Sequence, residues 1–317
     1  MRSLLLLTTF ALMRQASTKA TKPSATKKVG FIGLGIMGQG MSRRILEDSD
    51  VSLTVWNRSP EPVEKLLNEY SDNVNVVSSP KEVIANSDIT FLMLSTPEAC
   101  QNVYPSVLDG VKSGSKLVDC ATLRPCDMKK YSAEVKNKGG LFLEAPVSGS
   151  KLPAEQGSLI FLCGGDEEVL ESATPYFDLM GKATHYFGDI GEGTKMKLIV
   201  NGLMANMLAS LGESILLAEN QGLDTTKMLE VLSQGAMNNP MFALKGPAMN
   251  DYHNSPFNAA FPLKHATKDL VFSIEELSSN GDMSISKAAR EYYDKAIAQG
   301  YSDEDFAAVI KAIQKKR

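Results

Sequence analysis

The side chains best suited to chemistry in this chain are Lys197 and Asn201, in an apolar stretch without proline that follows Gly191 and Gly193. The stretch predicts an α-helix to residue 218, and positions i and i+4 of a helix share one face. Lys195 lies two positions back, roughly 200° around the helix, and should point elsewhere. A lysine held beside an amide could protonate a developing alkoxide. By spacing alone, a solvated lysine beside an ordinary polar asparagine is the more common interpretation.

The composition is that of an ordinary soluble globular protein. The 317 residues are 43% hydrophobic and 22% charged, with a net charge of −4 and a mean hydropathy of −0.12. This length allows two domains with a core each. The negative charge argues against a general nucleic-acid surface, and we expect no membrane partner. The four cysteines form no CxxC pair and are interpreted as reduced thiols; with the three histidines they lack metal-ligand spacing, so no metal site is predicted.

The first 28 residues differ from the rest of the chain. They are basic and rich in Ser and Thr, and no acidic residue appears before Glu47. The apolar run at residues 4–13 is too short to span a bilayer, which takes about 20 residues. The composition is typical of an organelle transit peptide, so we expect a mitochondrial protein, with a plastid as the next alternative. Residues 4–7 would also fit a signal-peptide core, and the protein would be cytosolic if the leader is not used.

A glycine-rich turn follows the first predicted strand, at residues 28–32. The turn is Gly33-Leu34-Gly35-Ile36-Met37-Gly38. A helical stretch continues through residue 46, and a second strand is predicted at 51–56. This βαβ order, with GxGxxG between strand and helix, is typical of a dinucleotide site. The glycines permit the tight turn and let a pyrophosphate approach the free N–H groups of the helix N-terminus.

The residues that end the second strand bear on which dinucleotide binds. NAD-binding proteins place an acidic residue about 20 positions on, where it accepts hydrogen bonds from the ribose. Here that place holds Asn57, Arg58 and Ser59. A carboxylate would repel a 2′-phosphate, whereas arginine can hold it through two parallel charge-assisted hydrogen bonds. We therefore expect NADPH or NADP+; the alternative is a surface arginine beside an uncharged ribose contact.

Further apolar runs predict strands at residues 89–94, 116–120, 141–145 and 159–163. Ligands of open α/β sheets bind at the carboxyl ends of the strands. Two polar groups follow such ends, Thr122 and the turn Ser148-Gly149-Ser150. Their hydroxyls and turn N–H groups could receive an anion, although residues of these types more often serve only as turns.

The predicted fold is an α/β Rossmann (doubly wound) domain that binds NADP(H), over residues 29–190, followed by an all-α substrate and oligomerisation domain over residues 191–317. In the second domain the helical pattern is broken at residue 222, at 239–240 and across 246–256.

Two local patterns mark the predicted helices of the second domain. Small residues recur at helical spacing, and the stripe would let another helix approach, from this chain or from a second subunit. These residues are Gly202, Ala205, Ala209 and Gly212. For the last helix, Ser302 and Asp305 predict an N-terminal capping box, and the basic residues 315–317 suit a helix C-terminus.

Together these motifs resemble the β-hydroxyacid dehydrogenases, which include 3-hydroxyisobutyrate dehydrogenase and 6-phosphogluconate dehydrogenase. Residues 33–38 match the family's glycine-rich turn, and residues 144–150 match its substrate loop, usually Asp-Ala-Pro-Val-Ser-Gly-Gly. The catalytic motif GxGxxxKxxxN is matched by Gly191, Gly193, Lys197 and Asn201, and the closing Lys-Asp-Leu by residues 268–270. The resemblance runs from residue 28 to the C-terminus.

Three stretches resemble one branch of that family, the glyoxylate/succinic semialdehyde reductases. They are residues 144–155, 235–242 and 260–265; the first departs from the usual family loop at Glu144 and Ser150. Enzymes of this branch prefer NADPH, in agreement with the independent interpretation of Arg58. The resemblance therefore implies an NADP-dependent oxidoreductase that reduces small aldehyde acids, glyoxylate to glycolate and succinic semialdehyde to 4-hydroxybutyrate.

Two other functions stay open. One is an NAD-dependent dehydrogenase of the 3-hydroxyisobutyrate type. The other is a non-catalytic NADP-binding scaffold or chromatin-associated factor, because a nuclear chromatin factor of the same branch lacks the catalytic lysine. Lys197 argues against this second alternative. The family also implies a homodimer or homotetramer.

The resemblance assigns roles to individual residues. Lys197 would be the general acid, with Asn201 orienting it or bonding the substrate oxygen; burial between domains would lower the pKa of the lysine from about 10.4. The implied substrate-binding residues are Thr122, Ser148, Gly149, Ser150, Phe261 and Asp269. The implied cofactor-binding residues are Gly33, Leu34, Gly35, Ile36, Met37, Gly38, Asn57, Arg58, Ser59, Leu94, Ser95, Thr122 and Lys268, the last reaching over from the second domain.

Overall fold

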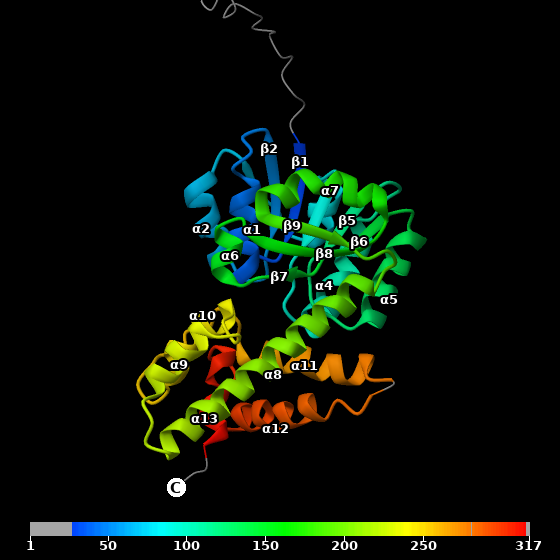
Figure 1. The fold of residues 1–317 in the computed structure, drawn as a ribbon. Coiled ribbons are helices and arrows are strands. Elements are labelled where there is room, and N and C mark those ends of the chain that lie inside the picture. The colour runs from blue at the N-terminus through cyan, green and yellow to red at the C-terminus, as the bar shows by residue number, and fades with distance from the viewer. Residues whose placement is uncertain (1–26, 280, 315–317) are drawn as a thin grey trace, which may run out of the picture.

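The computed structural model describes residues 27–279 and 281–314 (Figure 1). The targeting segment predicted at residues 1–28 lies outside the described residues except for Lys27 and Lys28, which belong to the first strand. The predicted basic helix end at residues 315–317 also lies outside them.

The N-terminal domain is built on a nine-stranded sheet in the order β3-β2-β1-β4-β5-β6-β8-β7, with β9 paired to β8. The first six strands in this order are parallel, and β8 runs antiparallel to β6 and β7. The strands are β1 Lys27–Ile32, β2 Val51–Trp56, β3 Val74–Val76, β4 Ile89–Leu92, β5 Lys116–Asp119, β6 Leu141–Glu144, β7 Val147–Ser148, β8 Leu159–Gly165 and β9 Gly181–Tyr186. From β1 the chain winds outward to β2 and β3, then returns to β4 on the other side of β1, which confirms the doubly wound fold.

Helices cover both faces of the sheet, because successive strand residues point to opposite faces. Phe31 and Phe91 belong to the core on one face, and their neighbours Ile32 and Leu92 to the core on the other. The first face is covered by α1 Ile36–Ile45, α2 Glu61–Tyr70, α6 Lys151–Glu155 and α7 Glu167–Met180. The second is covered by α3 Pro80–Ala85, α4 Pro97–Gly110 and α5 Pro125–Asn137.

The strands predicted from apolar runs are confirmed, with ends that shift by one or two residues. The sequence analysis missed β3, β7 and β9. Strand β9 pairs with β8 at the edge of the sheet, and four of its six residues are exposed. Such a strand carries no apolar run, so its sequence offers no strand signal.

The C-terminal domain is helical, as predicted. Its elements are α8 Glu192–Asn220, α9 Thr225–Gln234, α10 Pro240–Asn250, α11 Leu263–Leu277, α12 Ser284–Ala298, a 3-10 helix Phe306–Val309 and α13 Ile310–Ile313. The long helix α8 leaves the sheet domain and runs through the second domain, with α11 and α12 beside it (Figure 1). Catalytic-motif residues near its start thus face the junction of the domains.

The small-residue stripe of α8 meets helices of the same chain. A Cβ added at Gly202 would lie 2.9 Å from Ser273 Oγ of α11, and one at Gly212 would lie 2.7 Å from Ile313 Cδ1 of α13. Close helix packing within the second domain therefore accounts for both glycines.

One local prediction for the second domain is wrong in part, and another is wrong. The break expected across residues 246–256 begins only at residue 251: helix α10 runs through Gly246 to Asn250, and Gly246 packs closely there, with its Cβ position 3.2 Å from Leu229 of α9. The capping box at Ser302 does not form among the described residues: it needs the Asp305 N–H to donate to the Ser302 side chain, and this N–H instead donates to the carbonyl oxygen of Phe257 at 2.9 Å. Asp305 is itself the cap of the 3-10 helix and accepts from Ala307 N at 3.2 Å.

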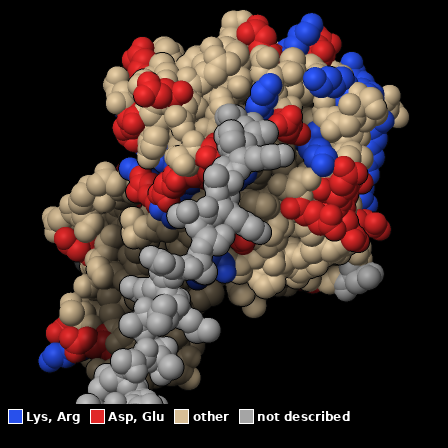
Figure 2. Space-filling model, turned by 90° about the horizontal axis from the view of Figure 1, so that it is seen from above, with Lys and Arg blue, Asp and Glu red and all other residues tan. Residues whose placement is uncertain are grey.

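Helix α8 is the one described helix long and apolar enough to cross a membrane, by length and composition alone. Half of its apolar window is buried inside the structure, and one such helix is weak evidence for a membrane span. On the face seen in Figure 2, basic and acidic side chains lie next to one another.

Candidate active site

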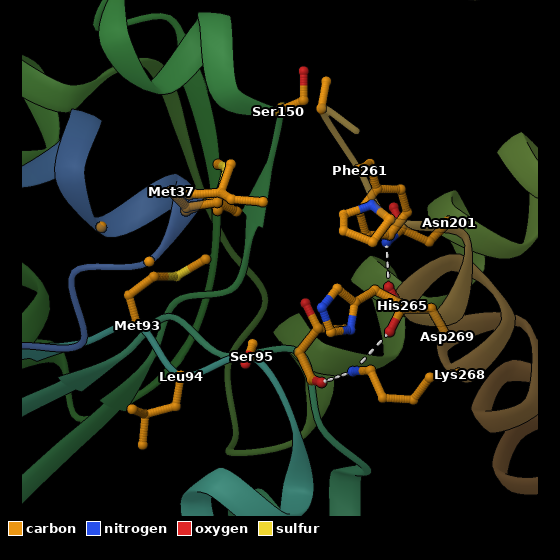
Figure 3. A pocket seen from close by; sticks show the side chains of 18 of the residues that line it. Met37, Met93, Leu94, Ser95, Ser150, Asn201, Phe261, His265, Lys268 and Asp269 are labelled. Atoms are coloured by element: carbon orange, nitrogen blue, oxygen red, sulfur yellow. Dashed lines mark hydrogen bonds and ion pairs between the residues drawn. The ribbon is translucent and has the colours of Figure 1, made fainter. Parts of the chain in front are cut away.

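A cavity of about 300 Å³ lies between the two domains, at the carboxyl ends of β1, β4 and β5 (Figure 3). Residues 35–38, 93–95 and 122 line it from the sheet domain, and α8 and α11 line it from the other side. A smaller second lobe of about 230 Å³ adjoins it. The two lobes share Gly149, Ser150, Lys197, Asn201 and Phe261.

The glycine turn at the head of α1 leaves room for a ligand. Gly33 has φ +97°, and a Cβ there would lie 2.5 Å from Met93 O; a Cβ at Gly38 would lie 2.0 Å from Gly33 O. A Cβ at Gly35 would meet nothing within 4 Å, so the turn is open at this residue. Gly35 caps α1, whose first turn holds no acidic residue. Unpaired N–H groups and the positive end of the helix dipole therefore suit a pyrophosphate.

Asn57 ties the end of β2 to this turn. Its Oδ1 accepts from Leu34 N at 2.8 Å, and its Nδ2 donates to Ser59 O at 2.8 Å. Arg58 next to it is exposed and has no ion pair or hydrogen bond within the part of the chain that the structure describes. Gly33, Leu34 and residues 57–59 do not line the cavity itself; they lie behind and beside the open glycine turn.

A chain of hydrogen bonds crosses the cavity wall. Lys197 Nζ donates to Asn201 Oδ1 at 2.9 Å, as the spacing of the two residues predicts, and Asn201 Nδ2 donates to Asp269 Oδ2 at 2.7 Å. Asp269 Oδ1 lies 2.9 Å from Lys268 Nζ, which also donates to the carbonyl oxygen of Thr122 in the sheet domain. Lys268 thus joins the two domains directly beside the cavity.

Burial changes the protonation of Lys197. The side chain is 5% exposed, and desolvation is the main reason why the pKa of its ammonium falls to about 8. The negative charge of Asp269 raises this pKa and the positive charge of Lys268 lowers it. A lysine with a pKa near neutrality gives up its proton far more readily than a solvated one. Lys195 instead pairs with Glu192 at 2.6 Å, away from both lobes.

Glu144 holds the N-terminus of α8. Its Oε1 accepts from Gly191 N at 2.9 Å and from Thr194 N at 3.2 Å, and its Oε2 from the Thr194 hydroxyl at 2.7 Å. Burial raises the pKa of the Glu144 carboxyl to about 6. Since Lys197 lies one turn after Thr194, this carboxylate at the end of β6 fixes the helix turn that carries Lys197.

The turn after β7 is the other polar wall of both lobes. Gly149 has φ +135°, and a Cβ there would lie 2.7 Å from Leu159 Cδ2, so the turn requires glycine. The hydroxyls of Ser148 and Ser150 make no hydrogen bond to any described residue. In Figure 3, Ser150 and Phe261 are seen at the same, upper end of the space, with Met37 across from Phe261. Free hydroxyls beside Lys197 can receive an anionic group.

His265 of α11, to which no role was assigned from the sequence, also lines the cavity. Burial, and then the charge of Lys268, lowers the pKa of its imidazole. It precedes Lys268 and Asp269 by three and four residues, so helical spacing would have placed all three on one face. Met93, Val147, Ala260 and Pro262 also line the cavity and were not predicted.

Comparison with known proteins shows the family. The model of the NAD binding domain of 6-phosphogluconate dehydrogenase matches residues 28–188, and that of the NAD-binding domain of NADP-dependent 3-hydroxyisobutyrate dehydrogenase matches residues 191–313. The chain belongs to the β-hydroxyacid dehydrogenase family. This confirms the resemblance seen in the motifs.

Three relatives illustrate the range of the family. The chain is 42% identical to the chloroplastic glyoxylate/succinic semialdehyde reductase 2 of Arabidopsis thaliana, over 95% of this chain and 83% of that protein. It is 33% identical to the cytokine-like nuclear factor N-PAC of Gallus gallus, over 95% of this chain but 54% of that protein. The structure of Mycobacterium tuberculosis 3-hydroxyisobutyrate dehydrogenase with L-serine is similar at a TM-score of 0.80 and 25% identity, over 92% of this chain and 100% of that one.

The β-hydroxyacid dehydrogenase fold thus binds a nicotinamide dinucleotide and acts on a CH–OH group. The open turn at Gly35 and the head of α1 fit the pyrophosphate of such a cofactor. When bound, the cofactor supplies or accepts the hydride. Of this chain's own residues, Lys197 donates from Nζ to Asn201 Oδ1 at 2.9 Å, and the Ser148–Ser150 turn lines the same lobe as these two side chains.

Proposed function

We propose that the protein is an NADPH-dependent reductase of small aldehyde acids, with glyoxylate and succinic semialdehyde as substrates. The observation that carries this proposal is the buried Lys197–Asn201–Asp269 chain, which lies in the cavity beside the open glycine turn. The 42% identical Arabidopsis relative, a glyoxylate/succinic semialdehyde reductase, supports the same substrates.

In the proposed reaction Lys197 is the general acid. NADPH, when bound, would supply the hydride to the carbonyl carbon, and Lys197 Nζ would donate a proton to the carbonyl oxygen, where negative charge would develop. The products are the hydroxy acid, NADP+ and a neutral lysine, which takes its proton back from solvent. The lowered pKa of Lys197 supports this role, because the proton is held only weakly near neutral pH. The free hydroxyls of the Ser148–Ser150 turn would bind a carboxylate bonded directly to the aldehyde carbon, as in glyoxylate.

Arg58 supports NADPH over NADH. Its guanidinium is exposed and without a described partner, at the carboxyl end of β2, where the cofactor ribose binds in this fold. Free guanidinium groups suit the bidentate geometry of a phosphate.

Two alternatives are separated by the same assay. A 3-hydroxyisobutyrate-type dehydrogenase would oxidise that hydroxyacid with NAD faster than it reduces the aldehydes with NADPH. A non-catalytic scaffold, which the N-PAC relative raises, would bind NADPH without turning over any of these compounds.

The test measures NADPH oxidation by the chain from Lys27 onward with glyoxylate and with succinic semialdehyde, beside 3-hydroxyisobutyrate with NAD or NADP. We expect turnover of both aldehydes, faster with NADPH than with NADH. Absence of turnover with either aldehyde would contradict the proposed substrates.

We also propose a homodimer or homotetramer. Apolar side chains are exposed along α8, notably Ile199, Leu203 and Leu217, and a second subunit would bury them. In light scattering we expect an oligomer that Leu203→Glu weakens and that Val76→Glu, on an exposed strand of the sheet domain, leaves intact. A wild-type monomer at micromolar concentration would contradict this proposal.

The composition of the first 28 residues supports import into mitochondria. The word chloroplastic in the name of the Arabidopsis relative keeps the plastid as the alternative. A fluorescent protein carrying these residues should enter mitochondria in cells with both organelles; plastid or cytosolic fluorescence would contradict the assignment.

A further inference from the structure

The second lobe combines apolar walls with two positive charges. Its charged lining side chains are Lys197 of α8 and Lys245 of α10, and among the described residues that line it there is no carboxylate. The rest of the wall is largely apolar: Pro153, Met204, Pro240, Met241, Leu244, Phe261 and Phe306. A ligand suited to this lobe has an anionic or polar group at each end and methylene groups between them.

Lys245 is held in place by Asp305 and Phe306. Its side chain is 12% exposed, and Nζ lies 2.8 Å from Asp305 Oδ2 and 5.3 Å from the centre of the Phe306 ring. Asp305 is itself buried, so it faces Lys245 from behind the wall and does not line the lobe. An ammonium group has three N–H donors. The Asp305 contact uses one of them, so Lys245 retains donors for a ligand.

Asp305 also shapes the wall that the two lobes share. Its Oδ2 accepts from Ala260 N at 3.1 Å and from Phe261 N at 3.3 Å. One carboxylate therefore positions both Lys245 and the backbone of Phe261. The wall at Phe261 and the Lys245 ammonium are therefore fixed relative to each other.

We propose that Lys245 binds the distal carboxylate of aldehyde acids that carry methylene groups between aldehyde and carboxylate, so that it sets the preference of the site for chain length. The inference rests on the proposed function. In glyoxylate the carboxylate is bonded directly to the aldehyde carbon, and the Ser148–Ser150 turn beside Lys197 serves it. In succinic semialdehyde two methylene groups separate the two ends. Those groups lie along Met204, Met241 and Leu244, and the carboxylate reaches Lys245.

The experiment compares kcat/KM for glyoxylate, succinic semialdehyde and uncharged butanal in wild type and Lys245→Met. A hydrogen bond to a charged group is worth about 10- to 100-fold in binding. We expect Lys245→Met to lower the ratio of succinic semialdehyde to glyoxylate by at least tenfold, mostly through KM. The ratio of kcat/KM for succinic semialdehyde to that for butanal should fall by the same factor. In Lys245→Arg, which keeps the positive charge, both ratios should stay close to those of wild type.

Lys311→Met is the matched control. Lys311 pairs with Glu304 at 2.8 Å and lies 4.9 Å from the Phe257 ring, an environment like that of Lys245, but it lines neither lobe. Its substitution should leave both ratios unchanged.

If Lys245 only supports the fold, Lys245→Met will lower kcat/KM equally for all three aldehydes, and the proposal is wrong. The proposal would also be overturned if the ratio of kcat/KM between succinic semialdehyde and glyoxylate were the same in Lys245→Met as in wild type. Failure of the wild type to reduce either aldehyde acid would instead refute the proposed function, so the two failures are distinguishable.

Discussion

Asn201 and Asp269 fix the direction in which the Lys197 ammonium points. Because the Asp269 carboxylate can only accept, Asn201 must turn its Nδ2 toward it, at 2.7 Å, and its Oδ1 toward Lys197, at 2.9 Å. Both polar ends of the Asn201 side chain are thus engaged within the protein. Of the two roles open to Asn201, the structure therefore favours orientation of Lys197 over direct contact with substrate.

The charges beside Lys197 predict opposite shifts of the pH profile. Asp269 raises and Lys268 lowers the pKa of Lys197, which is about 8. Reduction needs the ammonium form, so kcat/KM for the aldehyde should fall as pH rises through that pKa. In Asp269→Asn the fall should begin at lower pH, and in Lys268→Met at higher pH. Shifts in the same direction in both variants would contradict the assignment of the limb to Lys197.

Glu144 should matter for stability and for turnover. Glu144→Ala leaves the N–H groups of Gly191 and Thr194 and the Thr194 hydroxyl without their acceptor. We expect a loss of about 2 kcal/mol in the free energy of unfolding, and a lower kcat because the turn that carries Lys197 loosens. Glu168→Ala, at an exposed glutamate, is the control. Urea unfolding measures the first effect, and an unchanged midpoint in Glu144→Ala would show that the carboxylate does not hold α8.

Arg58 should act on the cofactor alone. In Arg58→Leu we expect the KM for NADPH to rise about 10- to 100-fold, because losing a hydrogen bond to a charged group weakens binding by about that factor. The KM for NADH should change less than twofold, since NADH has no 2′-phosphate. Equal changes for both cofactors would leave no role for Arg58 in phosphate recognition.

The buried ammonium of Lys197 should lower the free energy of unfolding of the protein. Its pKa in the folded protein is about 8 and its ordinary value is 10.5, so between these two values the unfolded chain binds more protons. Stability from this group therefore rises with pH across that window and is lowest below pH 8. The change corresponds to about 3 kcal/mol in the free energy of unfolding.

Lys197→Met removes this dependence. Relative to wild type, the variant should be most stable at pH 7 and should lose that advantage as pH rises toward 10. Chemical unfolding at several pH values measures the difference, and an advantage that grows with pH would contradict the lowered pKa.

The sequence predicted the parts of the site that lie within a few residues of one another. Lys197 and Asn201 share a helix face by spacing alone, and the glycine turn follows a strand and opens a helix in a recognisable order. The strands of the sheet interior were found because each is a continuous apolar run. Strand β9 was missed because it is polar and exposed at the edge of the sheet.

Contacts across the chain could not be predicted. Glu144 was seen only as a departure from the usual family loop, although it binds the head of α8 some 50 residues on. Lys245 meets Asp305 across 60 residues of sequence, where Asp305 was expected to serve a capping box. Which side chains share a cavity depends on how the two domains pack, and no local pattern encodes that.

The most direct test of the account is NADPH-dependent reduction of glyoxylate and succinic semialdehyde by wild type and by Lys197→Ala, with NADPH binding measured on both by fluorescence. If Lys197 is the general acid, kcat should fall by at least about 100-fold in the variant, the lower end of what a general acid contributes, while NADPH binds as in wild type. Turnover in Lys197→Ala that matches wild type, with the same pH dependence, would show that the proton comes from another group.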